Sequence, residues 1–138
     1  MTPAGYSGTP LPKKLGIKPG HRVRVIAGPP DFDATLGELP EAVTVRRDLR
    51  GKDAADVMLF FTTDAKELRE RFAALAGRLE KNGGLWICRP KKASGVATDV
   101  TDSVVREIGL AAGLVDNKVC AVDETWSGLR FVYRLKDR

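Results

Sequence analysis

Two adjacent lysines, Lys91 and Lys92, stand with Ser94 and Gly95 in the segment RPKKASG, between an apolar run and a helix-like pattern. Ammonium groups, a hydroxyl and unpaired backbone N–H groups ahead of a helix all favour a bound anion. The segment lacks the GxxxxGK[ST] spacing of a phosphate loop. The alternative is structural: the lysines pair with acids such as Asp123, and Ser94 forms a turn. The sequence leaves both interpretations open.

Residues suited to catalysis are few. The single histidine, His21, falls in a turn before the first predicted strand and is interpreted as a solvated residue. No Gly-x-Ser-x-Gly elbow and no His-Glu-x-x-His pattern occurs. The titrating groups that remain for catalysis are Lys91, Lys92, Asp64, Asp123 and Glu124. The sequence therefore favours a binding or regulatory protein over an enzyme.

The two cysteines, Cys88 and Cys120, lie inside apolar, strand-like runs. No second Cys or His stands at metal-ligand spacing from either residue. Both are interpreted as buried thiols, and no metal site is predicted.

The formal net charge is +5, and the basic residues are clustered. Residues 1–30 carry five basic side chains and no acid, and further basic clusters fall in residues 84–98 and in the last ten residues. Such clusters are typical of proteins that bind an anionic small molecule, an acidic protein segment or a nucleic acid, although a mildly basic surface is the simpler interpretation. Nucleic acid ranks last because only Tyr6, Phe32 and Trp126 offer aromatic rings in loops or at element ends.

The pattern of strands and helices indicates an α/β fold. Strands are predicted over residues 22–28, 43–48, 56–62, 84–90, 118–126 and 129–135. One helix is predicted from Asp64 to a stop at Asn82-Gly83-Gly84, and a second over residues 101–114. This alternation predicts a three-layer, Rossmann-like fold with a mostly parallel sheet and a C-terminal antiparallel hairpin.

Three points of the organisation follow from local composition. Residues 1–20 are rich in Gly, Pro, Ser and Thr and are predicted to form an arm before a single domain over 21–138. Residues 49–55 are short for a parallel crossover, so either they stretch across the sheet edge or the preceding strand is short and irregular. The strand over 129–135, after a Ser127-Gly128 turn, either pairs with a second copy of the chain or uses its arginines to protect a sheet edge. No run is long and apolar enough to cross a bilayer, so a cytoplasmic location is expected.

Ligands of parallel α/β sheets bind beyond the carboxyl ends of the strands. If the predicted strands are right, that edge collects Gly28, Asp48, Thr63, Asp64, Lys91, Lys92, Ser94, Gly95, Asp123 and Trp126. Trp126 could stack on a ligand base or close the hairpin, and the second role is favoured. Trp86 lies within an apolar strand and is assigned to the core.

The segments LGIKPGHRVRVIAG and LEKNGGLWICRP, with the closing hairpin, resemble parts of the class I methyltransferase fold. The resemblance implies a site for S-adenosylmethionine near Gly28, with Asp48 as the acid for its ribose. Methyltransferases continue the first strand with a glycine-rich loop, whereas this chain reads GPPDFD. Pro29 and Pro30 have no N–H to donate. The chain is therefore expected to have lost, or never had, that cofactor site, and no cofactor is predicted.

The segments GYSGTPLPKKLGIKPG, PKKASGVATDVT and GLAAGLVDNKVCAVDETWSGLRF resemble a bacterial family defined only as a domain of unknown function, DUF3052. This resemblance implies relatives but no activity. The leading hypothesis is a non-catalytic binding or regulatory domain that holds an anion at PKKASG. The alternatives are a divergent S-adenosylmethionine-dependent methyltransferase and a nucleic-acid-binding protein.

Overall fold

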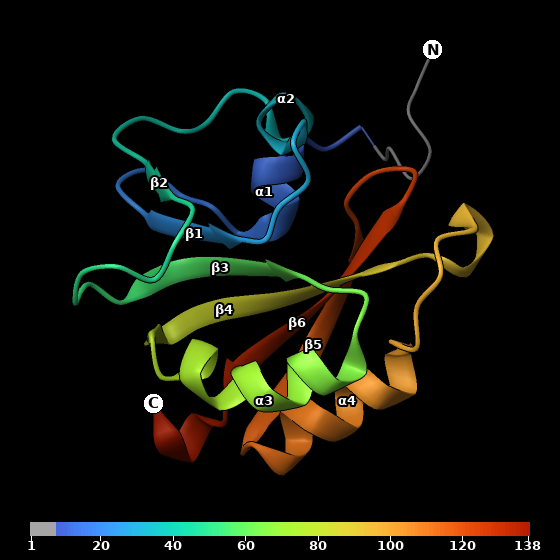
Figure 1. The fold of residues 1–138 in the computed structure, drawn as a ribbon. Helices are drawn as coiled ribbons and strands as arrows, with labels where there is room; N and C mark the ends of the chain where they lie inside the picture. The colour runs from blue at the N-terminus through green and yellow to red at the C-terminus, as the bar shows by residue number, and fades with distance from the viewer. Residues whose placement is uncertain (1–7) are drawn as a thin grey trace.

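A sheet of parallel and antiparallel strands runs through the protein with helices on both faces (Figure 1). The computed structural model describes residues 8–138. Its strands are β1 (Arg22–Ile26), β2 (Thr44–Arg46), β3 (Ala55–Phe61), β4 (Leu79–Pro90), β5 (Leu114–Ala121) and β6 (Trp126–Tyr133). Its helices are α1 (Leu11–Leu15), α2 (Phe32–Leu36), α3 (Ala65–Ala76) and α4 (Asp102–Ala111), with 3-10 turns η1 (Lys92–Ser94) and η2 (Leu135–Asp137).

The strand order across the sheet is β2-β1-β3-β4-β6-β5. Strands β2, β1, β3 and β4 are parallel to one another, whereas β6 runs antiparallel to both β4 and β5. The predicted Rossmann-like sheet with an antiparallel C-terminal hairpin is therefore confirmed. None of the helices within residues 8–138 is long and apolar enough to cross a membrane.

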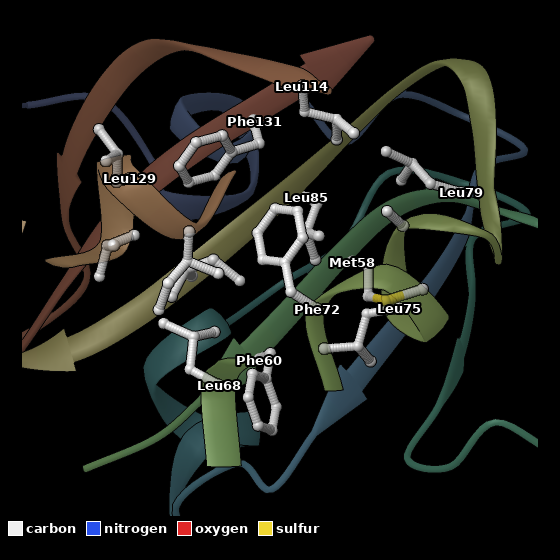
Figure 2. Close-up of a cluster of buried hydrophobic side chains, with 14 of the residues drawn as sticks. Met58, Phe60, Leu68, Phe72, Leu75, Leu79, Leu85, Leu114, Leu129 and Phe131 are labelled. Carbon is white, nitrogen blue, oxygen red and sulfur yellow. The ribbon is translucent and has the colours of Figure 1, made fainter. Parts of the chain in front are cut away.

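Helices α3 and α4 cover one face of the sheet and enclose the larger core (Figure 2). Leu68, Phe72 and Leu75 repeat at helical spacing on α3, and all three are buried against β3 and β4. The Asp64 carboxylate begins this helix by accepting the backbone N–H groups of Lys66 and Glu67. Of the apolar face predicted from Leu68, Phe72, Leu75 and Leu79, the first three residues lie on α3, whereas Leu79 is the first residue of β4.

Helices α1 and α2 cover part of the opposite face. Leu15 and Ile17 are buried there, and the indole Nε1 of Trp86 donates to the carbonyl of Leu15 at 3.0 Å. Residues 8–20 therefore pack on the domain and include a helix, where the Gly- and Pro-rich composition predicts an arm. Leu11 and Leu15 lie one helical turn apart and pack against the same core, and this local signal is stronger than the composition. Tyr6 lies outside the described residues.

The predicted helix stop at Asn82-Gly83-Gly84 is wrong, because α3 ends at Ala76 and these residues lie within β4. These glycines allow groups of neighbouring strands to approach β4 closely. A Cβ on Gly83 would lie 2.7 Å from the carbonyl oxygen of Asp56, and one on Gly84 would lie 2.3 Å from Nε of Arg130. Glycine in a strand marks such approaches as often as it ends an element.

The predicted Ser127-Gly128 turn is also wrong, since both residues lie inside β6. The chain reverses over residues 122–125, where the Asp123 carboxylate accepts the backbone N–H groups of Thr125 and Trp126 at 2.8 and 2.7 Å. Strand β6 is interior and β5 forms the edge. Because β6 is paired on both sides, this strand has no free edge for a second copy of the chain, and its arginines do not protect a sheet edge.

The short connection between β2 and β3 is held by two arginines. Arg24 on β1 is buried and donates to the carbonyl oxygens of Asp48 and Asp53 at 2.6 and 3.0 Å. Arg78 donates to the carbonyls of Leu49 and Gly51. Strand β2 has only three residues. Both expected explanations therefore apply: the strand is short, and the connection passes β1 to reach β3, with guanidinium groups satisfying its carbonyls.

Candidate functional site

The carboxyl ends of β3 and β4 meet the start of β6 at one edge of the sheet. The backbone N–H of Thr62 donates to the carbonyl of Cys88 at 3.1 Å, and that of Lys91 donates to the carbonyl of Thr125 at 2.7 Å. Residues 62–64, 91–95 and 123–126 therefore lie together, and we call them the rim. The register pair of Pro90 with Trp126 fixes this arrangement.

The loop of Lys91 to Gly95 forms a tight turn. The Ser94 hydroxyl donates to the carbonyl of Lys91 at 2.6 Å and accepts the N–H of Val96 at 3.2 Å. Gly95 has a φ of 76°, a left-handed conformation that favours glycine. Ser94 thus has a turn-forming role, and its hydroxyl is already hydrogen-bonded twice.

The sequence pattern suggests that this loop lies directly ahead of a helix, but in the structure it does not. Helix α4 begins at Asp102, after residues 95–101, and its first turn is capped by the Thr101 hydroxyl, which accepts from Val104 N–H. Asp102 also binds Arg89 at 2.7 Å. The positive end of α4 therefore contributes no anion site to the lysine loop.

The side chains of Lys91 and Lys92 differ from those of Asp64 and Asp123 in that their charged groups are not bonded to other groups in the described part of the protein. Lys91 is half-buried and Lys92 is exposed. Within residues 8–138 neither ammonium group forms a hydrogen bond or an ion pair, so the expected alternative pairing with Asp123 or Glu124 is not formed. Two unpaired positive charges therefore stand on a loop whose backbone is fixed.

Four of the other rim residues have structural roles, whereas the Glu124 side chain is exposed. Asp64 caps α3, and Asp123 forms the β5–β6 turn. The carbonyl of Thr63 accepts the Thr98 hydroxyl at 2.8 Å, which ties the end of β3 to the loop before α4. The Trp126 ring packs edge-on to Phe61 with centroids 5.1 Å apart, so it closes the hairpin against the core.

The turn after β1 packs on the preceding strand and leads into α2, rather than forming a cofactor-binding loop. A Cβ on Gly28 would lie 2.7 Å from Cγ1 of Val25, so the glycine permits packing of the chain on itself. The carbonyl of Pro29 accepts the N–H of Phe32 at 3.0 Å and leads into α2. A shallow cavity of about 290 Å³ lies beside this turn.

Asp48 is engaged by arginines and by the backbone. Its carboxylate accepts the N–H of Arg50 at 3.1 Å and lies 3.8 Å from the Arg50 guanidinium and 4.0 Å from that of Arg24. This acid therefore anchors the β2–β3 connection.

The remaining titrating groups are distributed over the molecule. His21 accepts the backbone N–H of Lys18 through Nδ1 at 3.1 Å, in the turn before β1. Cys88 and Cys120 are buried on one face, each opposite Gly128 of the intervening strand β6. Burial raises the pKa of both thiols. No group of three or more His, Cys, Asp or Glu side chains within residues 8–138 could hold a metal ion.

Arg130 is a candidate site residue that no sequence motif predicts. Its guanidinium lines a cavity of about 550 Å³ at the opposite end of the sheet from the rim. The available signal was the pair of glycines at 83 and 84, which marks a close approach but does not name the approaching residue.

Comparisons with known proteins agree with the geometry of the sheet. The model of a family described as "Protein of unknown function (DUF3052)" matches residues 12–135. No curated protein matches the chain in sequence.

Three solved structures with similar folds are methyltransferases. A putative methyltransferase from Thermoplasma acidophilum is 9% identical with a TM-score of 0.58, over 86% of this chain and 70% of that one. The magnesium protoporphyrin IX methyltransferase of Synechocystis PCC 6803, solved with bound SAH, is 14% identical with a TM-score of 0.58, over 84% and 75%. A SAM-dependent methyltransferase from Aquifex aeolicus is 16% identical with a TM-score of 0.56, over 86% and 85%. At these identities the likeness establishes the fold alone.

Proposed function

Because the chain belongs to the DUF3052 family and has a methyltransferase-like fold, we propose that it is a binding or regulatory protein on that scaffold, without catalytic activity. Its ligand is an anionic small molecule or an acidic protein segment, held at the rim by Lys91 and Lys92. The observation that carries the proposal is the pair of unpaired ammonium groups on a hydrogen-bonded loop. A fixed loop loses little conformational freedom when it binds.

The rim offers little for catalysis. Asp64 and Asp123 are committed to backbone N–H groups, and the only histidine lies at the opposite end of the sheet. A general base must reach the proton that it removes, and these carboxylates are held as caps and turns. The proposal therefore assigns the lysines to binding.

The proposal includes no S-adenosylmethionine. The residues after β1 do not fit that cofactor, because Pro29 and Pro30 have no N–H groups to donate. Gly28 is needed for packing within the chain, since a Cβ there would lie 2.7 Å from Cγ1 of Val25. Asp48, the expected partner of the ribose, faces Arg24 and Arg50 instead. A thermal shift and a titration with millimolar S-adenosylmethionine test this directly. Binding that Asp48→Asn abolishes would overturn the proposal in favour of a divergent methyltransferase.

A calorimetric titration with nucleotides and phosphorylated metabolites tests the rim. The double variant Lys91→Ala/Lys92→Ala is expected to weaken binding at the rim by about tenfold or more, since each charged hydrogen bond contributes on the order of 1.5–3 kcal/mol. The charge-matched control is Lys52→Ala/Lys136→Ala, which changes two exposed lysines elsewhere. Amide signals of residues 91–96 in NMR spectra report this site separately. Unchanged affinity and unchanged rim signals would show that the site assignment is wrong.

A further inference from the structure

A groove lies at the end of the sheet opposite the rim, on the face that carries α1. It encloses about 550 Å³. Its walls come from the α1–β1 segment, the first residues of β3 and β4, and the middles of β5 and β6. A volume of this size is typical of small-molecule sites.

Arg130 lies in this groove with its guanidinium over Gly84. A Cβ on Gly84 would come within 2.3 Å of Nε and 2.8 Å of Cζ of Arg130, so the glycine makes room for the planar group. Arg130 pairs across the sheet with Trp86, which places it on the face covered by α1. The groove therefore has a half-buried arginine against its floor.

The Arg130 guanidinium makes no hydrogen bond, ion pair or ring contact with any of residues 8–138. Its direct cross-strand neighbour on β5 is Lys118, and like charges directly opposite each other destabilise a sheet. Burial and, next, the charge of Arg138 lower the pKa of Arg130. A half-buried cation beside other cations has an electrostatic cost that an incoming anion would offset.

The acids that line the groove are already paired. Asp56 accepts the backbone N–H of Arg22 at 2.8 Å, and Glu80 binds the Arg22 guanidinium at 2.9 Å. The other charged groups that line the groove are all basic: Arg130, Lys18 and Lys118, with Lys14 donating to the carbonyl of Ala121 and Lys81 lying over the Tyr133 ring. Basic side chains therefore outnumber acidic ones in the lining of the groove.

We propose that this groove binds a phosphate-bearing small molecule, with Arg130 forming paired hydrogen bonds to a phosphate group and Lys118 and Lys18 adding charge. A planar guanidinium matches two phosphate oxygens, whereas the lysines act as point charges. A small molecule is favoured over a nucleic acid because the arginine lies against the groove floor.

Calorimetric and NMR titrations of the full chain with ATP and with pyrophosphate test the proposal. Arg130→Gln is expected to weaken ATP binding by about ten- to a hundredfold, and Arg130→Lys by less, because the charge remains and the fork is lost. In Gly84→Ala, the added methyl group displaces the Arg130 guanidinium, so this variant is also expected to weaken ATP binding. Far-UV circular dichroism and urea unfolding establish that each variant is folded.

The variant Lys52→Ala/Lys136→Ala, which changes two exposed lysines outside both sites, is the control and is expected to leave groove binding unchanged. Shifts of the Gly84 and Lys118 amides report the groove, while those of residues 91–96 report the rim, so either site can fail alone. Equal ATP affinity at the groove amides of the wild type and of folded Arg130→Gln, or no ATP binding at those amides in the wild type, would overturn the proposal. Arg130-dependent binding of single-stranded RNA or duplex DNA that is tighter than ATP binding would also overturn it, in favour of nucleic acid.

Discussion

Strand β6 presents two different surfaces on its two faces. Leu129 and Phe131 point into the core beneath α3 and α4, and the Phe131 ring packs edge-on to Phe72 with centroids 5.4 Å apart. Gly128 and Arg130 alternate with them and face the side of α1. The face of Leu129 and Phe131 thus consists of apolar packing, whereas the other face combines Trp126 and the buried Val132 with a glycine and an unpaired cation. The difference suggests that the first face serves stability and that the second is available for binding.

The sharpest test of this comparison is to truncate neighbouring residues on the two faces. Phe131→Ala is expected to lower the free energy of unfolding by about 3–5 kcal/mol, because the ring is fully buried and leaves a cavity. Arg130→Ala is expected to change it by less than about 1 kcal/mol. Urea unfolding measures both. Equal losses would show that Arg130 is a structural residue after all.

A second test adds one methyl group on each side of the sheet. A Cβ on Gly109 of α4 would lie 2.0 Å from Cε1 of Phe131, whose ring is enclosed by the core. Gly109→Ala is expected to cost about 1–3 kcal/mol despite its better helix propensity. The added methyl group of Gly84→Ala has the flexible Arg130 side chain as its nearest neighbour and is expected to cost less. A reversed order in urea unfolding would contradict the difference between the faces.

The pH dependence of stability probes the two thiols on the face that carries the groove. Burial raises the pKa of Cys88 and Cys120 in the folded state, so above about pH 8.5 the unfolded chain loses protons that the folded chain keeps. Stability is therefore full at neutral pH and falls as pH rises, by at most about 1.4 kcal/mol per pH unit for each thiol.

Urea unfolding between pH 7 and 10 measures this decline. The variant Cys88→Ala, despite its lower stability, is expected to show a shallower dependence on pH. The same slope in wild type and variant would mean that Cys88 is not the titrating group.

Much of the fold follows from local patterns. Leu68, Phe72 and Leu75 repeat at helical spacing, and Asp64 and Thr101 are typical capping residues. Helices α3 and α4 can therefore be predicted from the sequence. Glycine was the main source of error. The same residue type ends helices, forms turns and permits close approach, and at Gly84 and Gly128 the third use applied.

The candidate sites were predictable to different degrees. The carboxyl ends of parallel strands meet at one edge, so the sequence placed Lys91 and Lys92 near Asp123 and Trp126. It did not reveal which polar groups are used by turns and caps, as those of Ser94 and Asp64 are. The groove was not predictable, because in the sequence Arg130 is one charged residue in a strand of alternating polar and apolar residues, with nothing to distinguish it from a solvent-exposed arginine.

The sequence by itself determined the alternation of elements, the apolar faces of α3 and α4, the buried cysteines and the loss of donors at Pro29-Pro30. These are properties of residues close together in the chain, set by periodicity and backbone chemistry. Only the tertiary structure decided that β6 lies inside the sheet, that Arg24 and Arg78 hold the β2–β3 connection, and that Arg130 lies over Gly84. The physical reason is that strand order and register join residues far apart in sequence, and an arginine's role depends on which partners that register brings to it.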